Sequence, residues 1–497
     1  MNRFEQHKAD LSLEATSSRI SELARTGLTD EVDRKTIEQL RLWGLALRPK
    51  TEGHFMMRVR VPGGRLSADQ AEAVGEIARD FGRDCADVTA RGQLQLRWIA
   101  IGDVPAIFER LRAADLVTLQ TLMDSVRNIC GCPLAGRSPD ELFDASEDLA
   151  EAERLIVADE KTINLPKKMN VAITGCRGRC CRAHAQDLAL VPAKQWVRGE
   201  AIPGYHVLAG GKIGGKDHHL ARPLDVFLER HQAAEAVRQI VGIFEEHGPR
   251  KTRSRARLVH LLEMWGIERF RSELEQRMGV PLPRAGEDMR RPRVCQPTGI
   301  LPQRDAELVS AGLIVPVGRI GGSGLVAAAD LARRYGSGEL RLTGEQNVLI
   351  PDIPRSWLAE LRREPLLDEL PLEAHPAIAG TQSCTGSEYC SMAAIETKTR
   401  AADIARALAR RVPGAGRLRI HWSACHAGCG QHAIADIGLV GRRVQRGGES
   451  VEAVDIYLGN SAADRLAERV REQVPCDELL GELVGIVEQR FAMASAG

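Results

Sequence analysis

The chain has 497 residues, of which 43% are hydrophobic and 27% are charged. This composition excludes collagen, coiled coil and disorder as its main state and predicts a globular protein with large cores. Its 68 Lys and Arg nearly balance its 67 Asp and Glu. The formal net charge of +1 provides no overall positive potential that would attract nucleic acid or an anionic membrane. We therefore expect no nucleic-acid partner and no membrane partner.

The N-terminal residues 1–14 mix charges into every turn and lack the apolar segment of a signal peptide. No apolar run approaches the length of about 18 residues that a membrane helix needs. These features predict a cytoplasmic protein whose thiols stay reduced. The 12 cysteines then predict metal or cluster ligation rather than a disulfide framework.

Apolar residues at regular spacing predict the first elements of the chain. Alternation over residues 57–61 and 94–98 predicts two strands. Between them, apolar residues at i, i+3, i+4 and i+7 over 74–81 predict a helix. Further on, residues 138–141 (Ser-Pro-Asp-Glu) have the composition of a helix start with its cap, so we expect a helix to begin there.

The strand–helix–strand pattern recurs 254 residues later without a gap. The matching residues are Pro62, Gly64, Arg65, Gly82 and Thr89 in the first copy and Pro316, Gly318, Arg319, Gly336 and Thr343 in the second. The helical spacing recurs at 328–335. Residues 290–299 have two prolines and no periodicity, which predicts a linker between the copies. The last 35 or so residues are predicted to form an amphipathic helix.

A second block recurs at an offset of 249 residues. Its matching residues are Cys176, Cys180 and Asp187 in the first half and Cys425, Cys429 and Asp436 in the second. The two repeats together predict a duplicated α+β protein whose halves are related by a pseudo-two-fold axis.

Four cysteines in the second half form two close pairs. Cys384 and Cys390 are separated by five residues, and Cys425 and Cys429 by three. Such thiolates suit a metal or a [4Fe–4S] cluster, because soft sulfur ligands hold iron in tetrahedral sites. The five-residue gap lies outside the two to four residues typical of zinc ribbons and fingers, so the spacing favours an iron–sulfur cluster. Four unrelated reduced cysteines are the alternative.

From about Glu31 to its C-terminus the sequence resembles the family of sirohaem and [4Fe–4S] assimilatory nitrite and sulfite reductases. The stretches that look most like ferredoxin-dependent nitrite reductases are 31–45, 52–64, 85–97, 335–347 and 395–398. The resemblance implies that the cluster ligands are Cys384, Cys390, Cys425 and Cys429. It also implies that the thiolate of Cys429 bridges to the sirohaem iron.

The resemblance further implies duplicated ferredoxin-like half-domains plus two sirohaem- and iron–sulfur-binding α+β domains. The expected domains are a helical extension (1–50), the first half-domain (51–120), the first α+β domain on the substrate side (121–290), the second half-domain (300–370) and the second α+β domain with the cluster (371–497). One half alone is expected to keep the cluster. Cys176 and Cys180 are therefore interpreted as the relic of a duplicated ligand pair. The alternative is a second cluster that also uses Cys130, Cys132 and Cys181.

Four positions match the family's substrate-binding residues: Arg91, Arg127, Lys168 and Asn170. Cationic donors at these positions are expected to stabilise the anionic adducts of a six-electron reduction. The second copy carries Glu345 in place of Arg91, which implies a single substrate pocket. Asn170 favours nitrite, because sulfite reductases of the family carry lysine there and a monoanion with two oxygens needs less positive charge. Ordinary surface Arg and Lys are the alternative.

Sirohaem carries several carboxylates, which cannot be buried without cations or hydrogen-bond donors. The resemblance places Arg97, Lys167 and Lys216 at cofactor-contacting positions. Arg253 and Arg257, which belong to a short basic run, are expected to face the cofactor carboxylates as well. A solvated helix face is the alternative for that run.

No motif of the sequence resembles a nicotinamide or flavin site, so we expect electrons from a separate protein, reduced ferredoxin or a similar low-potential carrier. A monomer is expected. The leading hypothesis is a ferredoxin-dependent nitrite reductase that forms ammonia. The alternatives are a sulfite reductase of the same architecture, precorrin-3B synthase, and a non-catalytic electron-transfer protein that holds the cluster alone.

Overall fold

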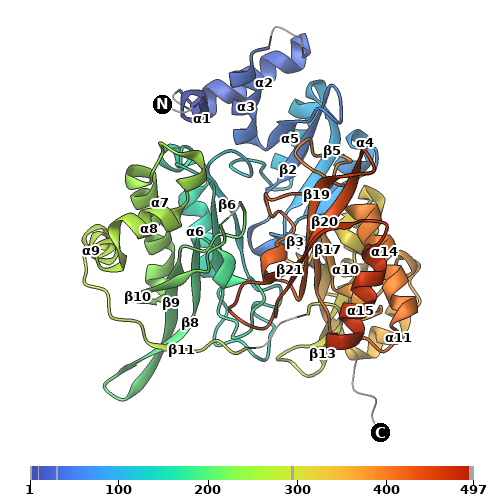
Figure 1. The fold of residues 1–497 in the computed structure, drawn as a ribbon. Helices are drawn as coiled ribbons and strands as arrows, with labels where there is room; N and C mark the ends of the chain where they lie inside the picture. The colour runs from blue at the N-terminus through green and yellow to red at the C-terminus, as the bar shows by residue number, and fades with distance from the viewer. Residues whose placement is uncertain (1–2, 9, 29–31, 216, 293–295, 492–497) are drawn as a thin grey trace.

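The computed structural model describes residues 3–8, 10–28, 32–215, 217–292 and 296–491. These residues form four sheets with helices packed against them, and each half of the chain provides one smaller and one larger α+β unit (Figure 1). Within this part of the chain, no helix has the length and apolar character needed to cross a bilayer.

The N-terminal region leads into the first half-domain. Its elements are α1 (Arg3–Lys8), α2 (Leu13–Thr26), α3 (Arg34–Gln39), β1 (Leu45–Leu47), β2 (His54–Val59), β3 (Arg65–Ser67), α4 (Ala68–Phe81), β4 (Ala86–Val88), β5 (Leu94–Ala100) and α5 (Val104–Ala113). The predicted strands and helix are confirmed, and α4 begins earlier than its apolar spacing suggests. A capping box sets this start, because the hydroxyl of Ser67 accepts from the Gln70 N–H and the Gln70 side chain accepts from the Ser67 N–H.

The second half-domain repeats the first. Its elements are β12 (Gly299–Pro302), β13 (Leu308–Leu313), β14 (Arg319–Ile320), α10 (Gly322–Tyr335), β15 (Glu339–Leu342), β16 (Val348–Pro354), α11 (Leu358–Leu361) and α12 (Leu366–Glu369). The two halves exchange a strand, since β3 pairs with β15 and β14 pairs with β4. Helices α4 and α10 meet at Gly75 and Gly322, where a Cβ on Gly75 would lie 2.7 Å from the Gly322 carbonyl oxygen. Both glycines therefore let the two halves share one core.

The first α+β domain follows the first half-domain. Its elements are β6 (Val126–Cys130), α6 (Ser146–Ile156), β7 (Met169–Ile173), β8 (Leu188–Val197), β9 (Glu200–Ala209), β10 (Arg222–Glu229), α7 (Ala233–His247), α8 (Leu258–Trp265), α9 (Ile267–Met278) and β11 (Glu287–Asp288). The sheet order is β10-β9-β8-β7-β6, with β6, β7 and β8 parallel. The parallel strands bring the loops that follow β6 and β7 to one edge of the sheet.

The second α+β domain repeats this sheet. Its elements are α13 (Pro376–Ala379), β17 (Thr381–Ser383), α14 (Lys398–Arg411), β18 (Ile420–Ser423), β19 (Ile437–Arg446), β20 (Glu449–Leu458), β21 (Glu468–Pro475) and α15 (Leu479–Phe491). The order β17-β18-β19-β20-β21 again has three parallel strands followed by antiparallel ones. The predicted duplication of an α+β unit is therefore confirmed.

One predicted helix is wrong and another is shorter than expected. The helix expected to start at 138–141 does not form there, because the Ser138 hydroxyl accepts from Asp140 N–H and Glu141 forms a bridge with Cys176, so α6 begins only at Ser146. The helix expected over the last 35 or so residues is replaced in part by β21, which completes the second sheet as β10 completes the first. A strand forms there instead of a helix, because the backbone of these residues pairs with the otherwise free edge of β20. Helix α15 follows, and residues 492–497 lie outside the described part.

Candidate active site

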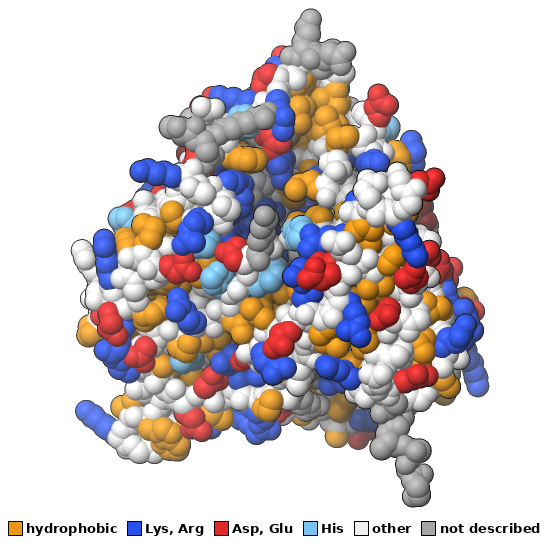
Figure 2. All heavy atoms as spheres, viewed as in Figure 1, with side chains coloured by type: hydrophobic (Ala, Val, Ile, Leu, Met, Phe, Trp, Pro, Cys, Tyr) orange, Lys and Arg blue, Asp and Glu red, His pale blue; other side chains and the backbone are white. Residues whose placement is uncertain are grey.

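A cavity of about 460 Å³ lies where the two half-domains and the two α+β domains meet. Figure 2 shows a hollow between the two lobes, with Lys and Arg side chains gathered inside it. The predicted site residues that line this cavity are Arg91, Arg97, Arg127, Lys167, Lys168, Asn170, Arg253, Arg257, Cys384, Cys390, Cys425 and Cys429. Lys216, also predicted, lies outside the described residues. Predicted site residues that are up to 338 positions apart in the sequence, Arg91 and Cys429, thus line one cavity.

Strand β5 and the loop before it supply one side of the cavity. Leu94 and Leu96 point into the core, so the alternate residues Gln95 and Arg97 face the cavity. Arg91 lies in the β4–β5 loop, whose turn is held by Thr89, since its hydroxyl accepts from the backbone N–H of residue 93 at 3.1 Å. This turn fixes the direction in which Arg91 leaves the loop.

The edges of β6 and β7 supply the opposite side. Arg127 on β6 is buried and donates to two backbone carbonyls, those of Thr121 and Met123. Asn170 on β7 donates its backbone N–H to Asp187 at 2.7 Å. Arg257 also donates to both oxygens of Asp187, at 2.7 and 2.6 Å. The carboxylate of Asp187 therefore positions one predicted substrate residue and one predicted cofactor residue together.

The electrostatics of the cavity favour anions. Among the described residues that line it, twelve are Lys or Arg and three are Asp or Glu. Burial, with the Arg257 and Arg91 guanidinium groups nearby, lowers the pKa of Lys168 to about 7. Burial and the Arg253 guanidinium lower the pKa of Lys167 to about 8. Burial and Arg91 lower the pKa of Arg127 to about 9. Each lowered pKa means that burial and neighbouring cations destabilise the charged form of the side chain. An anion placed in the cavity would stabilise that charged form.

Some of the predicted cations already pair with a protein carboxylate and could meet a ligand only with their remaining donors. Arg97 is paired with the buried Asp87 at 2.5 Å and donates to the Thr385 hydroxyl at 3.0 Å. Arg253 is paired with Asp124. Arg97 thus supports the loop after β17 as well as lining the cavity.

The four predicted cluster cysteines line the same cavity from one direction. Cys384 follows β17 and Cys425 follows β18, and since these strands are parallel neighbours their following loops are adjacent. The Ala424 N–H donates to the Cys384 sulfur at 3.1 Å, while burial raises the pKa of the Cys384 thiol to about 11. Among the described residues, the cysteine sulfurs that lie within 4.8 Å of one another belong to a different group, Cys132, Cys176 and Cys180.

The structure places further cations in the cavity that the sequence did not predict as site residues. They are Lys8, Arg41, Arg48, Arg58 and Lys398. The alternation of Arg58 with apolar neighbours on β2 is a signal that would have found it. Lys8 in α1 is buried, and its amino group donates to the Leu165 carbonyl at 2.7 Å. Helix α1 therefore closes one side of the cavity.

Among the described residues of the second half, no cavity corresponds to the substrate site of the first. Its residues at the positions of Arg91 and Asn170 are Glu345 and Arg419, by the offsets of 254 and 249. These two form an ion pair at 3.0 Å, and the cavity beside them has a volume of about 10 Å³. The ion pair fills the space that the first half keeps open.

Comparison with known proteins explains this duplication. Residues 48–114 and 301–367 match the family model described as the nitrite/sulfite reductase ferredoxin-like half domain. Residues 122–282 match the nitrite and sulphite reductase 4Fe-4S domain. The assimilatory ferredoxin-dependent nitrite reductase of Haloferax mediterranei is 37% identical, covering 100% of this chain and 90% of the relative. The chain belongs to the nitrite and sulfite reductase family. The family's cofactors are sirohaem and a [4Fe–4S] cluster.

Two more members of this reductase family are similar over their whole length. The ferredoxin–nitrite reductase of Synechococcus elongatus is 38% identical, covering 99% of this chain and 97% of the relative. The structure of the Mycobacterium tuberculosis NirA protein superposes with a TM-score of 0.91 at 28% identity, covering 100% of this chain and 95% of that chain. The predicted family and fold class are therefore confirmed.

Proposed function

We propose that this member of the family is an assimilatory ferredoxin-dependent nitrite reductase, which reduces nitrite to ammonia. The observation that carries the proposal is the single cavity in which four thiols of the second half face the cations of the first half. The names of the relatives from Haloferax and Synechococcus support both the substrate and the donor. Localisation in the cytoplasm and a monomeric state stay predictions.

The residues of the cavity fit the family's cofactors. We assign the cluster to Cys384, Cys390, Cys425 and Cys429, which line one cavity and offer the four thiolates that a [4Fe–4S] cluster needs. Cys429 lies close enough to Lys168 that a negative charge on its sulfur raises the pKa of that lysine. We assign the sirohaem carboxylates to Arg97, Lys167, Arg253 and Arg257, with Lys216 as a further prediction. When bound, these cofactors supply an iron for the substrate and a path for electrons.

Buried polar atoms also fit an anionic occupant. Several donors in the cavity wall have no hydrogen-bond partner among the described residues: Nε of Arg58, Arg91, Arg127 and Arg253. An unpaired buried donor is costly, so these groups are expected to meet polar atoms of ligands.

The chain's own residues then have distinct tasks. Arg91 and Arg127 hold the oxygens of the bound anion by charge and hydrogen bonds. Lys168, with a pKa of about 7, holds a proton at Nζ that it gives up readily at neutral pH. Asn170 adds an uncharged amide, which limits the positive charge at the substrate. Helix α1 shields these groups from water.

Turnover of nitrite and of sulfite by the cofactor-loaded enzyme, with reduced viologen as donor, tests the proposal. We expect kcat/KM for nitrite to exceed that for sulfite at least about tenfold, with ammonia as the product. A preference for sulfite would assign the enzyme to the other branch of the family. Inactivity toward both would favour precorrin chemistry, and an optical spectrum without haem bands would favour the electron-transfer alternative.

Asn170→Lys should shift the ratio of nitrite to sulfite activity toward sulfite by about tenfold or more, because it adds a charge beside the substrate. The ratio of the two kcat/KM values, measured on one preparation, gives the result. Asn170→Gln, which keeps the amide, is the matched control and should leave the ratio close to wild type. An unchanged ratio in the lysine variant would remove the role given to Asn170.

Lys168→Met should lower kcat about 10² to 10⁴-fold and flatten the pH profile, because a general acid is lost. In the wild type the donor must be protonated, so activity should fall as pH rises through the pKa of Lys168. That pKa is about 7 and moves upward when anions bind nearby. Lys168→Arg, which stays charged at every pH tested, should move the falling limb to higher pH. Identical pH profiles for all three enzymes would contradict this role.

A further inference from the structure

Arg182 and Gln431, which the repeat of 249 residues relates to each other, meet where the two halves of the chain join. Each stands directly before a short 3-10 helix, η5 (Ala183–Ala185) or η10 (His432–Ile434). Each also has the left-handed backbone conformation, with φ of 51° and 63°, which is uncommon for a residue other than glycine. Their side chains are hydrogen-bonded, so equivalent positions of the two halves face each other at this contact.

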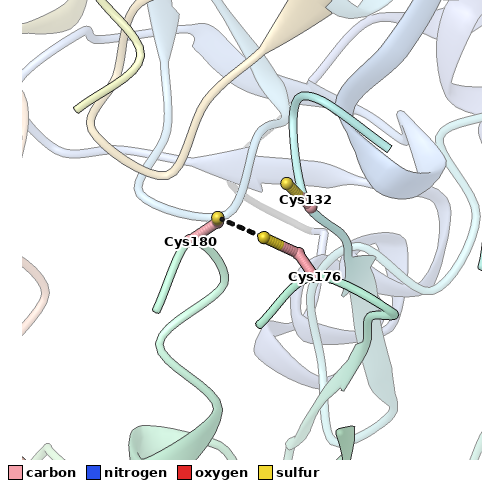
Figure 3. Close-up of side chains that lie close together, drawn as sticks. All are labelled: Cys132, Cys176 and Cys180. Atoms are coloured by element: carbon pink, nitrogen blue, oxygen red, sulfur yellow. Dashed lines mark hydrogen bonds between the residues drawn. The ribbon is translucent and has the colours of Figure 1, made fainter. Parts of the chain in front are cut away.

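Arg182 lies at the end of the loop between β7 and η5. Earlier in this loop the side chains of Cys176 and Cys180 lie beside Cys132 of the loop after β6 (Figure 3), and the three sulfurs are within 4.8 Å of one another. The Arg182 side chain is buried, with 4% of the residue exposed, although a guanidinium stays charged at neutral pH. A buried charge needs partners, and the Glu345 carboxylate provides one at 3.5 Å.

The other partners of Arg182 are the side-chain amides of two glutamines from the second half. Its guanidinium donates to Oε1 of Gln431 and to Oε1 of Gln382, the latter at 2.9 Å. Gln382 extends this network, since its own Nε2 donates to the Gly430 carbonyl at 3.3 Å. Gly430 and Gln431 directly follow Cys429 in the sequence. Arg182 therefore fixes the segment that follows this assigned cluster ligand.

The contact with Arg182 decides which end of the Gln431 amide faces the active cavity. A guanidinium has five donors and no acceptor, so an amide that meets it must present its oxygen. The Nε2 group of Gln431, with its two N–H donors, is left for other partners. None of the described residues accepts from these donors, and Gln431 lines the active cavity.

The second half shows what the position of Gln431 faces. The residues equivalent to Arg91 and Gln431 are Glu345 and Arg182, by the offsets of 254 and 249. Glu345 and Arg182 form an ion pair between the two halves at 3.5 Å, so this position meets an anionic oxygen in the pocket of the opposite half. The same repeat places Gln431 beside Arg91, and both residues line the active cavity.

An amide donor beside cations suits an anionic oxygen, because it adds a hydrogen bond without adding charge. We propose that Gln431 is a further anion-binding residue of the active cavity, which donates from Nε2 to an oxygen of nitrite or of a cofactor carboxylate, and that Arg182 is the positioning residue that fixes this direction. The inference rests on the proposed function, which supplies the two anions.

The experiment measures binding on the cofactor-loaded enzyme. Nitrite is titrated into the oxidised protein, its Kd is taken from the change in the optical spectrum, and the sirohaem content per chain is determined on the same preparation. Gln431→Met removes the donor. It should raise the Kd for nitrite at least about tenfold, or lower the sirohaem content at least about tenfold with the Kd unchanged. The first result places the donor on the substrate, and the second places it on a cofactor carboxylate.

The positioning role has its own variants. Arg182→Met should change the same quantity as Gln431→Met, because the amide can then turn its oxygen toward the cavity. Arg182→Lys keeps a donor against Oε1 and should bring that quantity back toward the wild-type value. Arg179→Gln removes a charge from the same loop, where Arg179 pairs with Asp464, and is the matched control that should leave both quantities unchanged. Equal losses in the methionine and lysine variants would contradict the positioning role.

The inference at Gln431 is overturned by a Gln431→Met protein with wild-type Kd for nitrite and wild-type sirohaem content. If this variant fails to fold, Gln431→Glu decides, since its carboxylate still pairs with Arg182 but has no donor. It should weaken nitrite binding or lower the sirohaem content at least about tenfold, and wild-type values would again overturn the inference. A wild type that neither binds nor reduces nitrite would contradict the proposed function instead, and the sirohaem content would still test Gln431.

Discussion

Cys429→Ser should lower nitrite turnover at least about 100-fold, because it removes a ligand that is expected to hold the cluster and to bridge it to the haem. The position of Cys429 supports this size of effect. Its side chain is exposed to the cavity, and a charge on its sulfur influences the pKa of Lys168, of Arg58 and of Cys384. Its charge therefore acts both on another cluster thiol and on cations of the cavity.

The measurement is kcat for nitrite together with the optical and electron paramagnetic resonance spectra of the purified variant. Cys476→Ser is the control, since it also replaces a cysteine of the second α+β domain, but Cys476 is buried and does not line the cavity. It should keep wild-type turnover. A Cys429→Ser enzyme with full nitrite turnover and an unchanged spectrum would contradict the bridging role.

Arg91→Glu should lower kcat/KM for nitrite about 10³-fold or more. Loss of one donor to a developing anion costs about 10² to 10³, and here the sign of the charge is reversed as well. The substitution copies the second half, where Glu345 stands at this position and pairs with Arg419. The charge of Arg91 already influences the pKa of Lys168 and of Arg127, so the variant should also raise both pKa values.

Steady-state kinetics with nitrite over a range of pH values check this prediction. Arg91→Lys keeps the positive charge but lacks the planar guanidinium with its paired donors. Its decrease in kcat/KM should therefore be much smaller than that of Arg91→Glu. Glu345→Gln should leave KM for nitrite unchanged, because the ion pair of the second half is separate from the active cavity. Equal kinetics for Arg91→Glu and Arg91→Lys would show that the charge at this position does not act on the substrate.

The sequence was sufficient for the features that local spacing encodes. The repeat at 254 residues predicted helices whose bounds in the structure, Ala68–Phe81 and Gly322–Tyr335, are separated by that same offset. The motifs also selected twelve site residues that line one cavity, although their roles stay predictions. Short motifs can do this because each one fixes a backbone turn and a side-chain direction within a few residues.

Other features depended on contacts between distant segments. The strand Glu468–Pro475 falls in the stretch predicted to form an amphipathic helix, but pairing with β20 made it a strand. The exchange of β3 and β14 between half-domains, and the closing of the cavity by α1, have no signal in local periodicity.

The cysteines show most clearly the difference between what local sequence spacing predicts and what contacts between distant segments decide. The sequence by itself determined the family, the duplication and the spaced pairs at Cys384–Cys390 and Cys425–Cys429. It left the grouping of Cys132 with Cys176 and Cys180 as an alternative, because Cys132 lies 44 residues before Cys176 and matches no ligand spacing. Only the tertiary structure decided that, since neighbouring parallel strands place the ends of distant segments within a few ångströms of one another.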